Sequence, residues 1–151
     1  MENTTASFIS KNTHINGDII SKSSIEIAGD VTGLVETEEN IMINGTVLGN
    51  IHGNDLITNG AKIDGDIECI NSIRIGEKSI VHGNITGKHI IIEGAVKGDI
   101  TAKSSVQIAN SAIILGNITT EQCQVSDGAS IEGQISPNNT EISPAKLFEN
   151  I

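Results

Sequence analysis

The feature that most constrains this chain is a glycine that recurs about every 16.6 residues. Each of these glycines is followed by one variable residue and then by Ile or Val, and successive spacings are 16, 16, 16, 18, 15, 18 and 17 residues. The eight glycines are Gly17, Gly33, Gly49, Gly65, Gly83, Gly98, Gly116 and Gly133. A regular period of this length is typical of a chain built from stacked structural repeats.

Within each repeat the aliphatic residues share one parity, so an extended chain would turn them all to one side. A short form has them at offsets 0, 2, 6 and 10, and a long form has offsets 0, 2, 6, 8 and 12. The short form is seen at Ile25, Ile27, Val31 and Val35; at Ile41, Ile43, Val47 and Ile51; and at Ile90, Ile92, Val96 and Ile100. The long form is seen at Ser7, Ile9, Thr13, Ile15 and Ile19; Asp55, Ile57, Ala61, Ile63 and Ile67; Ile73, Ile75, Ser79, Val81 and Ile85; Val106, Ile108, Ala112, Ile114 and Ile118; and Cys123, Val125, Ala129, Ile131 and Ile135. The offset-6 residue of the long form is always small, which predicts a crowded inward corner.

The composition favours strands over helices. The chain of 151 residues has no Trp or Tyr, only two Phe and 16 Gly, and Ile and Val supply almost all of its bulk. β-Branched residues favour strands, and the polar connectors are too short for a crossover helix. We therefore predict an all-β fold, a single-stranded right-handed parallel β-helix, or β-solenoid, of about eight turns of 15–18 residues. The expected division is a flexible tail over 1–7, the β-helix over 8–135 and a short C-terminal tail over 136–151.

A polar residue follows most of the repeat glycines. The set is Asp18, Asn50, Asp66, Asn84, Asp99, Asn117 and Gln134, with Asp30 in a related site. We expect these side chains to point outward in one column. They either form a stripe of cation ligands or provide turn chemistry, because Asp and Asn tolerate bends and bond to nearby backbone. The mixture of Asn with Asp favours turn chemistry.

A solenoid ends in strands that lack a neighbour, so its ends need a cap or a partner. At the C-terminal end the candidates are Leu147, Phe148 and Ile151, which fit one short helical turn. Phe8 and Ile9 are the candidates at the N-terminal end. For each group the sequence leaves two compatible roles open, a cap or an end-to-end contact between copies.

Several classes of function find no support in the sequence. A net charge of −10 disfavours binding to nucleic acid or to anionic lipid. No phosphate-binding loop is present, and His14, His52, His82 and His89 lie at unrelated phases of the repeat. Cys69 and Cys123 are too few and too far apart for a disulfide framework or a metal cluster. We expect no enzyme activity, no metal site and no cofactor.

Three segments carry a family resemblance. Residues 13–19, 43–51 and 92–100 resemble the recurring I-x-G-x-V-x-G-[DN]-I core of the bactofilins, and the likeness extends over roughly residues 8–135. It implies a bacterial, cytoplasmic cytoskeletal protein that assembles end to end without nucleotide. Such a protein scaffolds cell-shape, cell-wall or polar-localisation machinery, so its partners would be its own copies and cell-wall or polarity proteins. Many members attach to the inner face of the membrane through an N-terminal peptide; residues 1–7 depart from that pattern because they are acidic and polar.

The main alternative is an acyltransferase or carbonic-anhydrase-like trimer on a left-handed hexapeptide-repeat β-helix. Such chains repeat strictly every six residues, whereas the offsets here mix steps of two, four and six. A β-helical adhesin or secreted carbohydrate-active domain is a further alternative, disfavoured because residues 1–7 lack a basic start and an apolar run. A sharp trimer would support the enzyme alternative, whereas threads would support the bactofilin resemblance.

Overall fold

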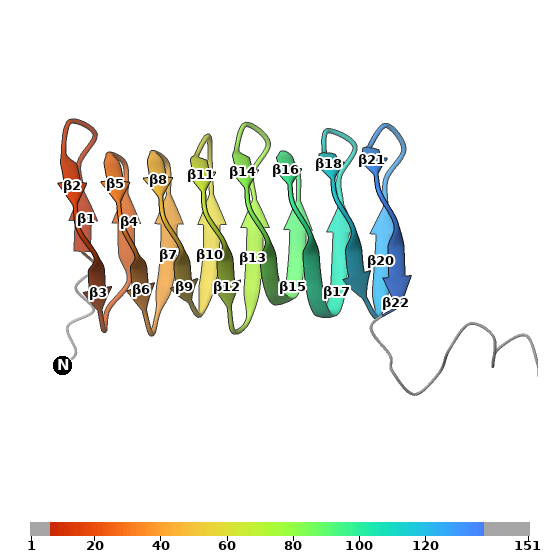
Figure 1. Ribbon diagram of the computed structural model, residues 1–151, viewed down its shortest axis with the longest axis horizontal. Helices are drawn as coiled ribbons and strands as arrows, with labels where there is room; N and C mark the ends of the chain where they lie inside the picture. Colours follow the sequence, from red (N-terminus) through yellow and green to blue (C-terminus); the bar gives the residue numbers. More distant parts are fainter. Residues whose placement is uncertain (1–6, 138–151) are drawn as a thin grey trace, which may run out of the picture.

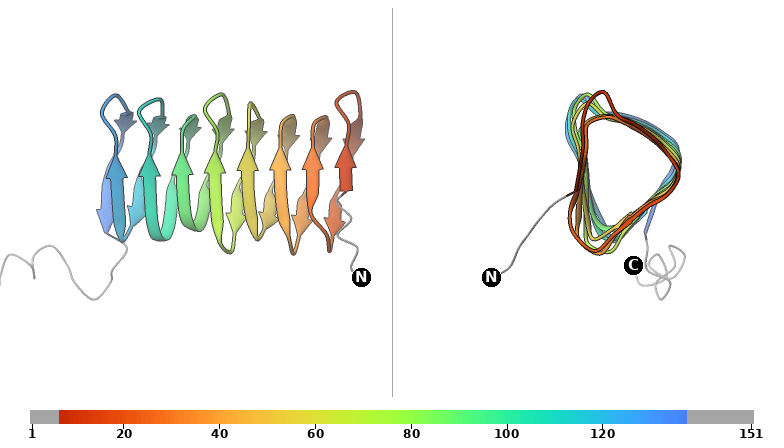
Figure 2. Two further views of the ribbon diagram at one scale, coloured as in Figure 1. Left: turned by 180° about the vertical axis from the view of Figure 1, so that it is seen from behind. Right: turned by 90° about the vertical axis from the view of Figure 1, so that its left-hand side faces the viewer.

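The structure, a computed structural model, describes residues 7–137, and within that range every regular element is a β-strand. Figure 1 shows the strands wound into similar turns that stack along one axis. Seen down that axis in Figure 2, each turn is a rounded triangle, so the rod has three faces. All strand pairs between successive turns are parallel, which confirms the predicted all-β solenoid of about eight turns. Its right hand stays a prediction.

The second face of the rod carries one strand from each turn, so its sheet has eight strands. They are β2 (His14–Asn16), β5 (Asp30–Thr32), β8 (Thr46–Leu48), β11 (Lys62–Asp64), β14 (Ile80–His82), β16 (Ala95–Lys97), β18 (Ile113–Leu115) and β21 (Ser130–Glu132). Each strand pairs only with the turn before and the turn after, and the register is unbroken.

The first and third faces are joined because two long strands run over the corner between them. These are β15 (Ile85–Ile92) and β17 (Ile100–Ile108). The remaining strands of the first face are β1 (Ser7–Ile9), β4 (Ile25–Ile27), β7 (Asn40–Ile43), β10 (Asp55–Thr58), β13 (Ser72–Ile75) and β20 (Gln122–Val125). Those of the third face are β3 (Ile19–Ser21), β6 (Val35–Thr37), β9 (Ile51–Gly53), β12 (Ile67–Cys69), β19 (Ile118–Thr120) and β22 (Ile135–Pro137).

The core consists of aliphatic columns that run the length of the rod. On the second face, Val31 pairs with Val47, Val47 with Ile63, and so on through Ile114. The interior turns bury these side chains almost completely, with exposures of 0–2% from Val31 to Ile114. Because each β-branched side chain stacks on a similar one a turn away, near-equivalent repeats build a continuous core.

One predicted inward pair is wrong. The sequence pattern placed Asp55 and Ile57 in the core, but Leu56 and Thr58 are buried at 0% and 2%, and Ile57 is 45% exposed. The register explains the difference, because Leu56 pairs with the buried Ile41. The loop that follows β10 is one residue shorter than the corresponding loop after β13. The short loop contains Gly60, whose φ of 67° permits the tighter bend.

A column of small residues on the third face was not foreseen. Its members are Ser21, Thr37, Gly53, Cys69, Gly87, Ala102 and Thr120, in register from turn to turn. A Cβ atom on Gly53 would lie 2.8 Å from Cδ1 of Ile41, and one on Gly87 would lie 3.0 Å from Cδ1 of Ile73. The small side chains therefore leave room for the isoleucines that enter the core from the first face.

Steric constraints at one corner of the rod explain why the repeat glycines are needed. All eight have φ between 140° and 156°, a conformation that L side chains rarely adopt. From Gly33 onward, a Cβ atom would also lie 1.9–2.2 Å from the carbonyl oxygen of the repeat glycine one turn earlier. The period seen in the sequence is therefore the stacking of backbone on backbone at one corner.

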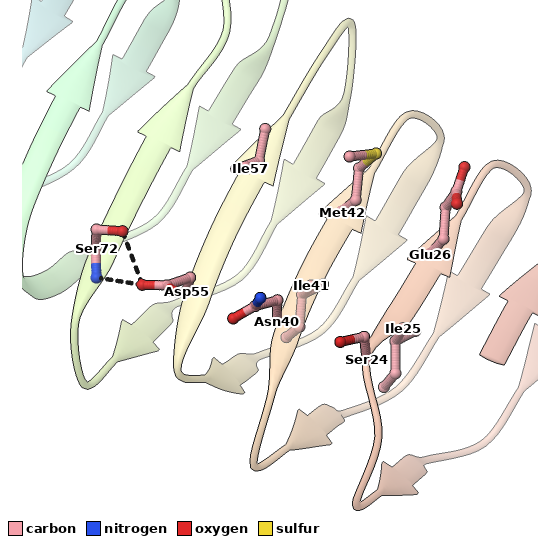
Figure 3. A pocket seen from close by; sticks show the side chains of 9 residues that line it. All are labelled: Ser24, Ile25, Glu26, Asn40, Ile41, Met42, Asp55, Ile57 and Ser72. Atoms are coloured by element: carbon pink, nitrogen blue, oxygen red, sulfur yellow. Dashed lines mark hydrogen bonds between the residues drawn. The ribbon is translucent and has the colours of Figure 1, made fainter. Parts of the chain in front are cut away.

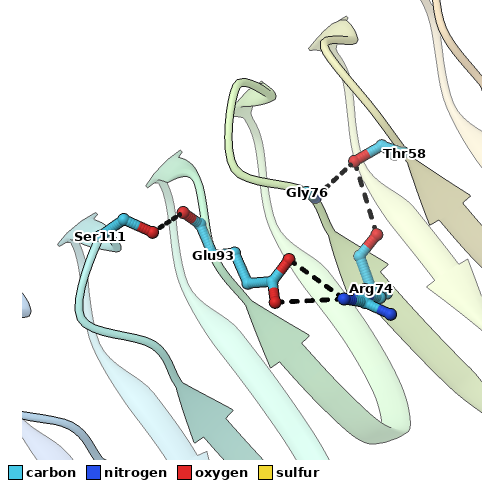
Figure 4. Close-up of polar contacts among 5 residues, drawn as sticks. All are labelled: Thr58, Arg74, Gly76, Glu93 and Ser111. Atoms are coloured by element: carbon cyan, nitrogen blue, oxygen red, sulfur yellow. Dashed lines mark hydrogen bonds and ion pairs between the residues drawn. The ribbon is translucent and has the colours of Figure 1, made fainter.

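A buried polar cluster holds the corner between the first and second faces. The Thr58 hydroxyl donates to Ser79 Oγ at 2.8 Å and accepts from the Gly76 N–H at 3.1 Å. Ser79 Oγ also accepts from the Ala61 N–H at 3.1 Å. Figure 4 shows Thr58 beside Gly76 and the carbonyl of Arg74. Through Ser79 the cluster provides an acceptor for the Ala61 N–H of the short loop.

Candidate functional site

The polar residues after the repeat glycines form a ladder along the outer surface. Oδ1 of Asp18 accepts a hydrogen bond from the N–H of Leu34, and the same bond recurs at 3.0–3.1 Å higher up the rod. The acceptors are Asp18, Asn50, Asp66, Asn84, Asp99 and Asn117. The ladder thus joins each turn to the next rather than bonding within its own turn. No group of three His, Cys, Asp or Glu within residues 7–137 is placed to hold a metal ion.

The ladder has one gap, at Leu34, whose side chain cannot accept a hydrogen bond from Asn50. Replacing Leu34 with asparagine is expected to fill the gap and to raise the free energy of unfolding by about 1 kcal/mol relative to Leu34→Ala, because a single hydrogen bond contributes about that much. Urea denaturation of both variants measures the difference. Equal stability of the two would show that the ladder bonds contribute nothing.

The two ends of the rod are the positions where the repeat stops. Strands β1, β2 and β3 pair with a following turn only, and β20, β21 and β22 pair with a preceding turn only. Each end therefore presents strand edges that have no strand neighbour among residues 7–137. Unpaired edges of this kind are templates for another copy of the chain.

The C-terminal end exposes inward-facing side chains that interior turns bury. Val125 and Ile135 are each 46% exposed, while Ile108 and Ile118, which lie one turn earlier in the same columns, are at most 1% exposed. Cys123 is exposed on the same end. The sequence pattern placed Val125 and Ile135 in the core, and their exposure arises because they lie in the last turn that the structure describes.

At the N-terminal end the two predicted residues lie on opposite sides of β1. Ile9 is buried at 8% and faces the core, where it pairs with Ile27. Phe8 is 61% exposed and pairs with Glu26 on the outer side of the first face. Leu147, Phe148 and Ile151 lie outside the described residues. The role of all five residues as caps or contacts stays a prediction.

A shallow hollow follows the strand starts on the outer side of the first face. It is lined by Met42, Ile57 and Ser72 among others, as Figure 3 shows. Inside it Asp55 Oδ1 accepts two hydrogen bonds from Ser72, from the N–H at 3.0 Å and from the hydroxyl at 2.8 Å. The carboxylate is thus engaged in joining two turns.

Ion pairs on the surface likewise connect adjacent turns. Arg74 lies 3.2 Å from Oε2 of Glu93, and the Ser111 hydroxyl donates to the Glu93 carbonyl at 2.8 Å, as seen in Figure 4. His14 lies 2.9 Å from Asp30 in the same manner. Exposed pairs of this kind contribute little individually. Their common feature is that they run along the rod axis.

The two cysteines differ in their surroundings. Cys69 faces the core, and burial is the main cause that raises the pKa of its thiol to about 12. Partial burial also raises the pKa of Cys123, although that thiol is exposed at the end of the rod. A thiol reagent in neutral solution therefore has access to Cys123 and not to Cys69.

The comparisons with known proteins agree with this geometry. The bactofilin family model, described as polymer-forming cytoskeletal, matches residues 7–70 and 59–136. No curated protein and no solved structure was found to match the chain. Within residues 7–137 no helix is long and apolar enough to span a bilayer. The family match favours a structural role over the hexapeptide-repeat enzyme. A repeating rod with open strand edges, matched along nearly its whole length by this family, identifies the chain as a member of the bactofilins, a family of polymer-forming cytoskeletal proteins.

Proposed function

We propose that this chain is a structural protein that assembles end to end into filaments without nucleotide, and that the filaments scaffold cell-shape, cell-wall or polar-localisation machinery. The observation that carries the proposal is the C-terminal end of the rod. There Val125 and Ile135 expose aliphatic surface next to unpaired strand edges.

Stacking of another copy on that end would cover the exposed aliphatic surface and pair the open strand edges at the same time. The terminal strands would gain backbone hydrogen bonds, and the aliphatic columns would continue across the junction. Contacts between ends of a straight rod do not close a ring, so repeated contacts give filaments. No step in this assembly requires the energy of a bound nucleotide.

Replacing Val125 with lysine is expected to abolish filaments, because a charge would be placed where the aliphatic columns meet. Gln124→Lys is the matched control, since Gln124 lies beside Val125 but turns outward and bonds to Gln107. Negative-stain electron microscopy and light scattering, in buffer free of ATP and GTP, compare the two variants. Filaments from Val125→Lys, or their loss in both variants, would contradict a contact at this end.

The exposed Cys123 gives a second readout in the unmodified chain. Its reaction with a chromogenic disulfide reagent is expected to slow at least about tenfold on assembly, because a stacked copy covers the thiol. Cys123→Ser supplies the baseline, as Cys69 is buried. An unchanged rate in visible filaments would place the contact elsewhere.

The C-terminal tail has two compatible roles, a cap and a contact. Removal of residues 138–151 would speed assembly if Leu147, Phe148 and Ile151 cover the end, and would slow it if they form the contact. Phe148→Arg distinguishes the side chain from the length of the tail.

The match to a polymer-forming cytoskeletal family supports the proposed scaffolding role and the proposed bacterial cytoplasmic location. Cross-linking in cells, followed by mass spectrometry, is expected to recover cell-wall or polarity proteins with the wild-type chain. Their loss with Val125→Lys, but not with Gln124→Lys, would tie recruitment to the filament. Equal recovery with Val125→Lys would separate recruitment from assembly.

A further inference from the structure

The outer side of the second face carries an apolar patch that neither the fold nor the end contacts use. Ile80, Ile113, Leu48 and Leu115 are 52%, 50%, 48% and 41% exposed, respectively. They border a shallow groove that extends over β8, β11, β14, β16 and β18. Ile80, Ala95 and Ile113 follow one another in one outward column, and Leu115 lies two residues from Ile113 on β18. These four residues form a contiguous aliphatic surface, which is the kind that marks an interaction site. Leu48 lies apart from them, because Asp64, His82 and Lys97 separate it from Leu115 in the other column.

The patch is built from two outward columns. The first residue of each strand gives Lys62, Ile80, Ala95 and Ile113, and the third residue gives Asp64, His82, Lys97 and Leu115. Together these eight residues form what we term the second-face patch. Their register is unbroken across four turns, so the outward side chains repeat at the spacing of the turns.

The charge of the second-face patch differs from that of the chain as a whole. The chain has a net charge of −10, which opposes side-by-side association of copies. The second-face patch has two lysines and one carboxylate. Lys62 has no ion-pair partner among residues 7–137, and Asp64 lies 4.0 Å from His82. This is a surface on which two copies can meet without strong repulsion.

We propose that the second-face patch binds the same patch of a second copy, with the two rods side by side and parallel. A two-fold axis along the rods keeps each turn level with its counterpart and places one column opposite the other. Lys62 then faces Asp64 of the second copy, and Ile113 faces Leu115 of the second copy, each contact occurring twice. Lys97 faces Ala95 of the second copy and carries its ammonium to the rim of the contact.

The opposite orientation is a poor fit. Antiparallel rods related by a two-fold axis across the patch place each column against itself, with the turns in reverse order. Lys97 would then face His82 of the second copy, and Asp64 would face Leu115 of the second copy. The Asp64 carboxylate would lose solvent without gaining a partner from the second copy, which is costly at an interface. Complementary charge thus selects the parallel pair, which leaves both ends of each rod free.

A charge exchange tests this contact. In the Val125→Lys background, where end contacts are removed, sedimentation velocity is expected to show dimers. Lys62→Glu and Asp64→Lys should each weaken dimerisation roughly tenfold or more, since each creates like-charge contacts. The double exchange should restore the affinity to within about threefold. Lys103→Glu and Glu36→Lys, on the third face, carry the same charge changes as controls.

A second pair of variants tests the apolar part. Ile113→Glu is expected to weaken the dimer roughly 100-fold, and Ile57→Glu, on the first face, is expected to leave it unchanged. Monomers at all concentrations, no recovery in the double exchange, or equal loss with Ile57→Glu would overturn the proposal. The end contact is judged separately. If Val125→Lys chains still form filaments, the end contact is refuted. The lateral contact is then still tested by the charge exchange between Lys62 and Asp64.

Discussion

Replacing Leu56 with aspartate is expected to unfold the rod at room temperature, while Ile57→Asp, one residue away, leaves it folded. Leu56 is fully buried in an aliphatic column, and an unpaired carboxylate there would lower the free energy of unfolding by about 5 kcal/mol or more. Ile57 is 45% exposed on the outer side of the same strand, so its replacement should change stability by about 0.5 kcal/mol or less.

Far-ultraviolet circular dichroism and urea denaturation of the two variants measure this contrast. The pair is matched in strand, turn and introduced charge, so the comparison isolates the direction in which each side chain points. If Ile57→Asp unfolds the chain and Leu56→Asp does not, the register of β10 is wrong.

The second large effect is expected at the repeat glycines. Gly65→Val should lower the free energy of unfolding by about 4 kcal/mol, the sum of an unfavourable φ and a steric conflict. Gly65 has a φ of 155°, and its Cβ would lie 2.1 Å from the carbonyl oxygen of Gly49. The two turns would have to separate at this corner, at the cost of hydrogen bonds on either side.

Gly60→Ala is the control for backbone conformation alone. Gly60 also has a positive φ, of 67°, but a Cβ atom there would meet nothing within 4 Å. Its replacement should therefore cost only about 1 kcal/mol. Denaturant melts of both variants give the comparison, and equal losses would mean that the close approach of the turns is relieved without penalty.

Much of the fold could be predicted from the sequence because the repeat glycines occur where successive turns of the backbone stack on one another. Gly65 and its equivalents are required by backbone contact between turns. Each turn has one such glycine, so their number gives the number of turns and their spacing gives the length of each turn. Alternating residues such as Ile41 and Ile43 report one face of a strand. The register of Leu56 could not be read in the same way, because Ile57 offers an equally apolar residue in the wrong phase. Only the shortened loop before Ala61 decides between them.

The candidate site was less accessible to sequence reasoning. Val125 and Ile135 resemble every other core residue in pattern, and their exposure follows only from being in the last described turn. Recognising the second-face patch requires knowing that Ile80, Ala95 and Ile113 lie in one outward column on three successive turns. Local alternation cannot provide that, since it predicts whether a side chain points inward or outward but not which side chains of other turns lie beside it. Large outward aliphatics such as Ile80 are the signal that an alternation search could have flagged.

The one-dimensional arrangement of turns has a consequence for how the protein loses its structure. Each turn is supported only by its two neighbours, so opening should begin at the terminal turns and progress inward. Joining copies removes those starting points, and mass action then makes heat resistance rise with protein concentration. Amide hydrogen exchange would report this as protection that spreads outward from Ile63 toward Ile15 and Ile131 as chains are joined.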